Sequence, residues 1–312
     1  ADVAYAVWRY WQTTGDDAFM RDYGAEIVLD TAVFWGSRVE RNEDAGRYEI
    51  RDVIGPDEYH EHVDNNAYTN YMVRWNLQKG LDVLAWLRKQ DPQQARILAE
   101  RLHLTAERLD HWADVCRHMY TPYDPVTGLI EQSDGFFGLA ELDWQALEPR
   151  TCPVQLALGI EATNGVQALK QADVLMLLYL LEDEFDARTQ QANWRYYEPR
   201  TDHSYGSSLG PAIHGIMGCR LGETDLAYEH FQRAAWVDLQ DLRGNGKDGI
   251  HAASAGGVWQ MIVMGFAGMR LGEAGPTFEP RLPRHWRRLR FAVRYRGQRH
   301  EIDLRPDPAG AL

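Results

Sequence analysis

An acidic loop at residues 53–72 carries the side chains of this chain that are best suited to acid–base chemistry. Its sequence is VIGPDEYHEHVDNNAYTNYM, and six acidic residues or histidines fall within eight positions: Asp57, Glu58, His60, Glu61, His62 and Asp64. A Gly-Pro turn that presents carboxylates just before a helix can hold a proton donor. For an arbitrary loop of this composition a solvated acidic turn is the simpler interpretation, so other parts of the chain have to decide.

A second candidate site is GKDGIHAASAGGVWQ at residues 246–260. His251 and Ser254 precede Gly256 and Gly257, and we expect a helix to run onward from the glycines. Small residues let backbone N–H groups approach a ligand, and a helix N-terminus favours an anion. The stretch is therefore a candidate phosphate site, with a close helix contact that tolerates glycine as the alternative. It is not a Walker-type loop, because no GK[ST] follows the glycines.

Two further stretches combine polar residues with a predicted helix start. Lys170 and Gln171 open an apolar helix expected over residues 166–181, where the lysine could bind a ligand or simply extend to solvent. Residues 196–211, YYEPRTDHSYGSSLGP, precede a helix expected from about Pro211; a polar turn with capping serines is the alternative. The polar residues of this stretch are Arg200, Asp202, His203, Ser204, Ser207 and Ser208.

The elements that must position these loops are mainly helices, because apolar residues recur at helical spacing. The pattern predicts helices after Asp16, over 67–89, after Asp91 and over 105–119. CRLGE at 219–223 and MRLGE at 269–273 predict two helices that end alike, with Gly222 and Gly272 in the left-handed conformation. Repeated helical hairpins of about 50 residues suggest a solenoid or a closed helical toroid.

The pattern changes near residue 274, where prolines at 276, 280 and 283 break helices. Residues 289–295 and 298–304 then alternate apolar and polar side chains across Arg296-Gly297. That alternation predicts a β-hairpin.

Composition limits the classes of partner and compartment. A net charge of −13 without a long Lys/Arg stripe argues against nucleic acid or an anionic membrane as the main partner. The longest apolar run is too short for a membrane helix. Cys116, Cys152 and Cys219 are too widely spaced for a disulfide framework or a zinc motif, which favours a reducing, cytoplasmic location. The abundant aromatic residues fit core packing or stacking on sugar rings.

The four stretches, in this order, resemble glycoside hydrolase family 65, which includes maltose, trehalose, kojibiose and nigerose phosphorylases. The resemblance rests on AEIVLDTAVFWGSRVE, the acidic loop, KQADVLMLLYL and HAASAGGVWQ, and it covers most of the chain. It implies an all-α (α/α)6 toroid, of which residues 1–273 would be a portion, followed by the start of a small β domain at 274–312. The family's N-terminal β-sandwich and first barrel helices have no counterpart here, so we expect a longer natural protein.

The resemblance also implies roles for individual residues. Glu58 matches the general acid, Lys170 and Gln171 match a substrate-binding pair, and Asp57, Glu61 and Asp64 would support the loop. The phosphate loop would consist of His251, Ser254 and the Gly256-Gly257 backbone, with Ser207 and Ser208 near it and His203 as a looser match. In this chain Gly206 stands where the family pattern has an aspartate before the two serines.

The implied reaction is inverting phosphorolysis of an α-linked glucosyl disaccharide to β-glucose 1-phosphate and a free sugar. Glu58 would protonate the glycosidic oxygen, and phosphate would attack C1 without a catalytic base. We expect the acid to be buried, because burial favours the protonated form of a carboxyl. Phosphate would be a co-substrate, with neither an organic cofactor nor a metal, and the full-length protein could be a homodimer.

Three alternatives stay open. A hydrolase of the same family would need a second carboxylate to activate water, and Asp202 is the best candidate. A sugar-binding fragment without catalysis would follow if the front half were missing in the natural protein. A helical interaction solenoid would have no need for the acidic loop.

Overall fold

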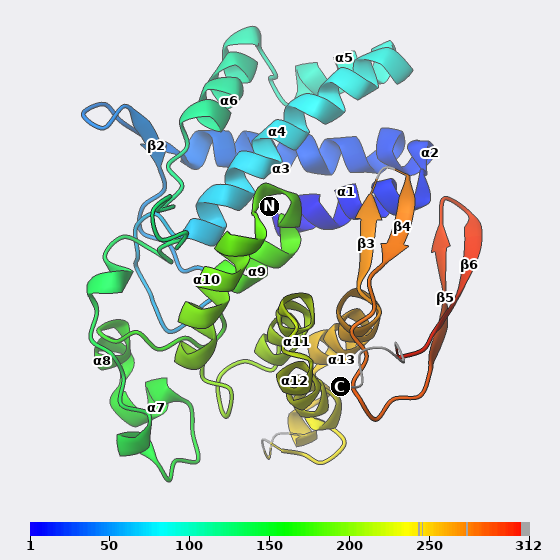
Figure 1. The fold of residues 1–312 in the computed structure, drawn as a ribbon. Helices are drawn as coiled ribbons and strands as arrows, with labels where there is room; N and C mark the ends of the chain where they lie inside the picture. Colours follow the sequence, from blue (N-terminus) through cyan, green and yellow to red (C-terminus); the bar gives the residue numbers. More distant parts are fainter. Residues whose placement is uncertain (243, 245, 273, 307–312) are drawn as a thin grey trace.

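Helices dominate the computed structural model, which describes residues 1–306 except 243, 245 and 273 (Figure 1). The α-helices are α1 (Asp2–Thr14), α2 (Asp17–Phe19), α3 (Ala25–Arg38), α4 (Ala67–Gln90), α5 (Pro92–Arg101), α6 (Ala106–His118), α7 (Val154–Leu158), α8 (Ile160–Asn164), α9 (Asp173–Leu180), α10 (Ala187–Tyr197), α11 (Gly210–Leu221), α12 (Thr224–Trp236) and α13 (Ala252–Gln260). Two π-helical turns, η1 (Met20–Gly24) and η7 (Met261–Phe266), continue α2 and α13. The 3-10 turns are η2 (Phe136–Gly138), η3 (Gln145–Leu147), η4 (Glu182–Glu184), η5 (Glu198–Arg200) and η6 (Gly246–Asp248).

Local capping chemistry sets several helix boundaries as the sequence predicts. Asp16 accepts a hydrogen bond from the Phe19 N–H at 2.9 Å, after Gly15 has ended α1 with a φ of 66°. Asp91 accepts from the Gln94 N–H at 2.9 Å at the start of α5. These side chains satisfy backbone donors that a helix leaves unpaired at its N-terminus. The predicted helices at 67–89 and 105–119 are confirmed as α4 and α6.

The long helix α4 joins the two largest parts of the core. Leu77 on one face packs in a cluster with α1, α3 and α6, and Met72 on another packs in a cluster with α9, α10 and α11. Trp112 of α6 is fully buried in the first cluster. It fills the space over Gly36, where an added Cβ would lie 2.4 Å from the Trp112 Nε1 atom. Because both clusters pack against α4, the position of this helix is fixed, and so is the position of the acidic loop that leads into its N-terminus.

Three antiparallel hairpins make up the described β structure: β1 (Glu40–Asn42) with β2 (Arg47–Glu49), β3 (Met269–Gly272) with β4 (Gly275–Phe278), and β5 (Leu289–Tyr295) with β6 (Gln298–Leu304). The last confirms the predicted hairpin, with Tyr295 opposite Gln298. Arg296 and Gly297 both have positive φ, as a two-residue hairpin turn requires. The Arg296 N–H donates to the Thr13 carbonyl at 2.7 Å, so this hairpin is attached to the end of α1.

Some predicted helix limits are wrong. Gly222 ends α11 in the left-handed conformation, as expected, but Gly272 lies in strand β3 and caps no helix. The helix expected over residues 166–181 begins only at Asp173. Before it, the Leu169 N–H donates to the Arg200 carbonyl at 2.9 Å, and the Asp202 N–H donates to the Leu169 carbonyl at 2.7 Å. These long-range contacts take up backbone groups that a helix would pair locally.

None of the helices in the described part of the chain is long and apolar enough to cross a membrane. The three cysteines, Cys116, Cys152 and Cys219, are all free, as their spacing predicts.

Candidate active site

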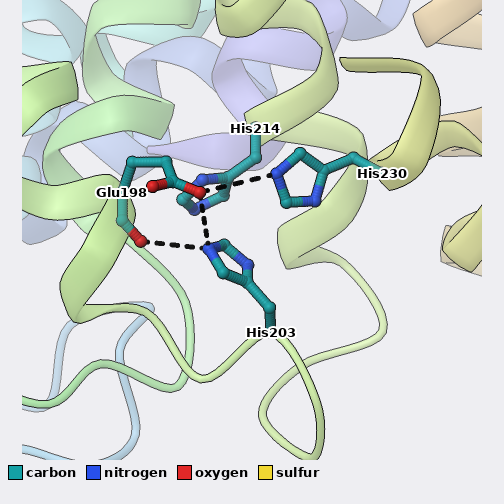
Figure 2. Close-up of side chains that lie close together, drawn as sticks. All are labelled: Glu198, His203, His214 and His230. Atoms are coloured by element: carbon teal, nitrogen blue, oxygen red, sulfur yellow. Dashed lines mark hydrogen bonds and ion pairs between the residues drawn. The ribbon is translucent and has the colours of Figure 1, made fainter. Parts of the chain in front are cut away.

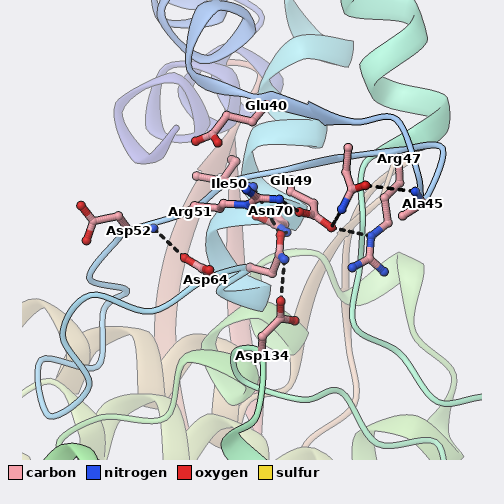
Figure 3. A network of polar contacts seen from close by, with 12 residues as sticks. Glu40, Ala45, Arg47, Glu49, Ile50, Arg51, Asp52, Asp64, Asn70 and Asp134 are labelled. Atoms are coloured by element: carbon pink, nitrogen blue, oxygen red, sulfur yellow. Dashed lines mark hydrogen bonds and ion pairs between the residues drawn. The ribbon is translucent and has the colours of Figure 1, made fainter.

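The acidic loop is closed at its base by backbone pairing. The Val53 N–H donates to the Val63 carbonyl at 3.0 Å, and the reverse bond measures 2.9 Å. Just outside this pair the Asp52 N–H donates to the Asp64 Oδ1 atom at 2.9 Å (Figure 3). The carboxylate of Asp64 therefore stabilises the loop, and the residues between the two valines form a defined turn.

A polar network holds the strand that leads into this loop (Figure 3). The buried carboxylate of Glu49 accepts from Arg47 Nε at 2.8 Å, Arg51 Nη2 at 2.8 Å and Asn42 Nδ2 at 3.0 Å. Burial would raise the pKa of Glu49, but the hydrogen bonds from Arg51 and Arg47 outweigh it and lower the pKa. The carboxylate thus stays ionised and fixes β2 directly before the loop.

Asp57 is a buried residue of the loop whose carboxylate contacts three neighbouring residues. Its Oδ1 atom accepts from the Lys170 N–H at 2.8 Å, and its Oδ2 atom accepts from Gln132 Nε2 at 2.8 Å and lies 2.7 Å from His60 Nδ1. The residue is almost fully buried. Both oxygens are occupied, so Asp57 positions its neighbours. Its supporting role agrees with the prediction, whereas Gln132 gave no signal in the sequence.

Glu58, Lys170 and Gln171 lie close together in the structure. Lys170 Nζ donates to Glu58 Oε2, and Gln171 Nε2 donates to the Pro56 carbonyl. The Oε1 atom of Gln171 is buried and has no hydrogen-bond partner among the described residues. It is available to accept from a ligand hydroxyl, because a buried acceptor gains from being paired.

Two expectations about this group need correction. The Glu58 side chain is 57% exposed, so the expected burial of the acid is wrong for this structure. Lys170 and Gln171 do not open a helix, because α9 begins at Asp173. They lie in a bend before α9 whose backbone bonds to Asp57, and this places the Lys170 side chain beside Glu58.

The Gly-Pro turn beneath Glu58 allows no side chain at Gly55. A Cβ atom there would lie 2.3 Å from Asp173 Oδ2 and 2.5 Å from Asn66 Nδ2. Asn66 Nδ2 itself donates to Asp173 Oδ2 at 2.7 Å. Burial, with the nearby charge of Asp57, raises the pKa of Asp173 well above its ordinary value. The turn therefore sits directly on a buried carboxyl at the start of α9.

Asp202 is committed to structural contacts. Arg150 donates to both carboxylate oxygens, Nη1 to Oδ2 at 2.7 Å and Nη2 to Oδ1 at 2.6 Å. Tyr59 Oη donates to Oδ2 at 2.9 Å, and the Tyr205 N–H donates to Oδ1 at 2.9 Å. Burial would raise the pKa of Asp202, but the Arg150 hydrogen bonds lower it. Sequence reasoning missed Arg150, which lies 52 positions away.

The predicted phosphate residues lie at the start of α13. His251 precedes the helix, and its backbone N–H donates to Asp238 Oδ2 at 2.8 Å while its Nδ1 lies 2.5 Å from Asp238 Oδ1. Ser254 is buried and its Oγ donates to the Ala234 carbonyl of α12 at 3.3 Å. Asp238 gave no signal in the sequence, although it orients the His251 ring.

The sequence predicts a helix that starts after Gly256 and Gly257, but α13 already starts at Ala252, so this prediction is wrong. The N–H groups of Gly256 and Gly257 are therefore beyond the helix's unpaired donors, and the available ones lie earlier in the first turn. At Gly257 an added Cβ would lie 2.5 Å from the Ala212 Cβ, so this glycine allows α13 to approach α11 closely. Gly256 has open space at the same position.

Ser207 and Ser208 lie just before α11, between the Lys170-Gln171 segment and the start of α13 in the sequence. The Ser207 N–H donates to the Lys170 carbonyl at 3.0 Å, which joins the serine segment to the residue that contacts Glu58. Ser207 Oγ accepts from the Leu209 N–H at 3.0 Å, as a turn serine does. His203 instead lies beside Glu198, His214 and His230 (Figure 2).

Two large cavities lie away from these residues. They measure about 580 Å³ and 590 Å³, and Tyr5, Arg9 and Glu182 line both. Neither is lined by Glu58 or His251. The candidate site is therefore identified by the contacts among its side chains and not by either of these cavities.

Comparisons with known proteins cover nearly the whole chain. Residues 1–260 match the glycosyl hydrolase family 65 central catalytic domain, and residues 269–309 match the C-terminal domain of that family. A kojibiose phosphorylase of Thermoanaerobacter brockii is 43% identical over 304 residues, which are 97% of this chain and 39% of that protein. An alpha,alpha-trehalose phosphorylase of the same organism is 40% identical over 312 residues, again 97% of this chain and 39% of the relative.

A solved structure shows the same fold. It is a human-microbiome protein described as a candidate kojibiose phosphorylase, with a TM-score of 0.90 and 30% identity, and it covers 98% of this chain and 44% of that one. The chain thus spans well under half the length of these proteins. The (α/α)6 fold with a short C-terminal β segment is confirmed. The chain belongs to glycosyl hydrolase family 65.

Proposed function

We propose that the protein containing this chain phosphorolyses an α-linked glucosyl disaccharide, with Glu58 as the general acid. The observation that carries the proposal is that Glu58, Lys170 and Gln171 lie together around the buried Asp57. Lys170 donates to Glu58, and Asp57 holds both the loop and the Lys170 backbone. The relatives that cover this chain are named as disaccharide phosphorylases, which supports the same chemistry.

In the proposed reaction Glu58 gives a proton to the glycosidic oxygen as the C1–O bond breaks. Phosphate attacks C1 from the opposite face, forms the new C1–O bond and inverts the configuration. Because phosphate is already a strong nucleophile, no second carboxylate is needed to activate it. The products are β-glucose 1-phosphate and the free acceptor sugar.

Lys170 and Gln171 would hold the sugar ring next to the acid. Gln171 offers a buried oxygen that can accept from a hydroxyl group, and Lys170 offers an ammonium that can donate to one. A bound sugar would take over the Lys170 contact and leave the Glu58 carboxyl free to reach the glycosidic oxygen. The partly exposed Glu58 would become enclosed only when substrate covers it.

Phosphate would be held by His251, by Ser254, whose hydroxyl would turn from the Ala234 carbonyl to the anion, and by the N-terminal end of α13, with Ser207 and Ser208 approaching from the segment before α11. The positive end of the helix dipole and the first-turn N–H groups favour an anion at this position. Asp238 orients the His251 ring through a 2.5 Å contact. Gly257 supports the site by letting α13 pack against α11.

The hydrolase alternative is weakened by the environment of Asp202. A water-activating base has to face the substrate with a free oxygen, whereas both Asp202 oxygens accept from Arg150 and the carboxylate is buried. Asp202 is therefore a structural residue below the loop. A sugar-binding protein without turnover is distinguished by the assay below.

The decisive experiment is synthesis in the reverse direction by the full-length natural protein. β-Glucose 1-phosphate is offered with a panel of acceptor sugars, and the released inorganic phosphate is measured. Acceptor-dependent phosphate release is the expected result. Release of glucose from an α-glucoside in phosphate-free buffer would instead indicate a hydrolase, and sugar binding without either reaction would indicate a binding protein. The homodimer and the cytoplasmic location stay predictions.

A further inference from the structure

Four side chains outside the proposed reaction converge in the interior of the chain (Figure 2). Glu198 comes from η5, His203 from the loop that follows it, His214 from α11 and His230 from α12. One ligand atom from each, an imidazole nitrogen or a carboxylate oxygen, lies within 4.8 Å of the others. Successive segments between residues 198 and 230 thus present three imidazoles and one carboxylate to a common point.

Most ring nitrogens of this cluster lack a hydrogen-bond partner among the described residues, although His203 Nε2 lies 3.0 Å from the Glu198 carbonyl. His214 and His230 are completely buried, and neither ring nitrogen of either residue has a hydrogen-bond partner among the described residues. The Nδ1 atom of His203 is also buried and unpaired. Buried polar atoms are nearly always satisfied by protein, water or an ion, because leaving them unpaired is costly. The cluster therefore requires an occupant.

The distances around Glu198 fit those of ligands on one metal ion. Its Oε1 atom lies 3.1 Å from His203 Nε2 and 3.8 Å from His230 Nε2. In a tetrahedral zinc site with bonds of about 2.0 Å, neighbouring ligand atoms are about 3.3 Å apart. We propose that Glu198, His203, His214 and His230 bind a divalent first-row transition metal ion, Zn²⁺ in the first instance. This site was not predicted from the sequence.

The protonation states of the cluster support the same assignment. Burial, with the nearby His203 and His230, lowers the pKa of His214, and burial also lowers the pKa of His230. The hydrogen bond from His203, with the nearby imidazole of His230, lowers the pKa of Glu198. Neutral imidazoles and an ionised carboxylate are the forms that bind metal. Four protein ligands leave no open position, which is typical of a structural rather than a catalytic zinc ion.

A bound ion would brace the part of the fold that carries the serine segment. It would tie η5 and the following loop to α11 and α12, and Ser207 and Ser208 lie within the braced stretch. Glu198 also lines a cavity of about 240 Å³ with Trp194 and Glu223, which offers an approach to the cluster. The ion would act through stability and local order, without contacting the reacting atoms.

The test uses the full-length natural protein, stripped with a chelator and then equilibrated with chelator-buffered Zn²⁺. Bound zinc is counted by elemental mass spectrometry after gel filtration, and thermal unfolding is followed with and without zinc. We expect one zinc ion per chain and a higher Tm with zinc. His203→Ala and His214→Ala should each weaken zinc binding at least tenfold, whereas His118→Ala, which alters an exposed ring beside Asp114, should bind as the parent does.

Co²⁺ loading of the unaltered protein gives a measurement that does not depend on variants folding. The expected result is the visible absorption of a tetrahedral cobalt site, displaced by one equivalent of Zn²⁺. The proposal is overturned if the unaltered protein binds no zinc at micromolar concentrations, or if His203→Ala and His214→Ala retain it. Either result would indicate a water-filled histidine cluster and would leave the proposed phosphorolysis untouched.

Discussion

The backbone N–H of Lys170 donates to the Oδ1 atom of Asp57 at 2.8 Å, across 113 positions of sequence. The same lysine reaches with its side chain to Glu58, the residue next to Asp57. One buried carboxylate therefore sets the backbone of the residue that contacts the proposed acid. This relationship separates two adjacent acidic residues, because both Asp57 oxygens are paired in the interior whereas the Glu58 side chain is exposed and pairs with Lys170.

Replacing Glu58 by glutamine should lower phosphorolysis and reverse synthesis by about 10²–10⁴-fold, because the amide cannot donate a proton to the leaving oxygen in the same way. Sugar affinity should change little. Glu61→Gln, in the same loop, is the matched control and should keep most of the activity. Substantial turnover by Glu58→Gln, measured as phosphate release, would contradict the assignment of the acid.

Replacing Ser254 by alanine should raise the KM for phosphate about tenfold while changing the KM for the sugar much less, because a lost hydrogen bond to an anion costs one to a few kcal/mol. Ser204→Ala, at an exposed position, should behave as the parent does. Equal changes in both KM values would point instead to the Ser254 contact with the Ala234 carbonyl.

Replacing Gly55 by alanine should destabilise the protein by about 1–3 kcal/mol, since the new methyl group would collide with Asp173 and Asn66. The turn that carries Glu58 should shift with it and lower kcat. Gly138→Ala is a suitable control because nothing lies within 4 Å of its Cβ position. Denaturant unfolding and kcat are the measurements, and a fully stable, fully active Gly55→Ala would refute the close contact.

Replacing Arg150 by methionine should destabilise the protein by about 3–5 kcal/mol, because it leaves Asp202 buried without its ion pair. Arg21→Met, which removes an exposed pair with Asp22, should have little effect. Denaturant unfolding measures both variants. If Arg150→Met were as stable as Arg21→Met, Asp202 would be less committed to structure, and its role as a base would have to be reconsidered.

Stability should fall as the pH rises above about 6.5 and through the folded pKa of His60. Burial would lower the pKa of His60, but the hydrogen bond and charge of Asp57 outweigh it and raise the pKa. The folded pKa is above the unfolded value of about 6.5, so the stabilisation is complete below that pH and is lost as pH rises through the folded pKa. His60→Gln should flatten this part of the curve of unfolding free energy against pH. Identical curves for parent and variant would contradict the coupling to Asp57.

Features governed by local chemistry could be predicted from sequence. Asp16 and Asp91 cap their helices because a capping side chain bonds to N–H groups only a few residues ahead. The β5–β6 hairpin was placed correctly because strand alternation and the Arg296-Gly297 turn are both short-range signals.

Features that depend on hydrogen-bond partners outside the segment itself could not be predicted from the sequence. The apolar run at 166–181 fits a helix throughout, yet Leu169 pairs with backbone groups at Arg200 and Asp202, so α9 starts at Asp173. The residues MRLG at 269–272 resemble CRLG at 219–222, but Met269–Gly272 pairs with β4 as a strand. In the first case tertiary hydrogen bonds replace the local ones that the helical period would predict, and in the second the bonds of a short hairpin do.

Sequence patterns alone established which chemical groups are present and much of the order of helices. They singled out Glu58 with Lys170 and Gln171, and these residues lie close together. Tertiary contacts were needed to establish that Glu58 is partly exposed, that Asp202 is paired with Arg150, and that three histidines share one point with Glu198. The reason is that burial and charge pairing depend on which distant segments the fold brings together, and no local pattern records that.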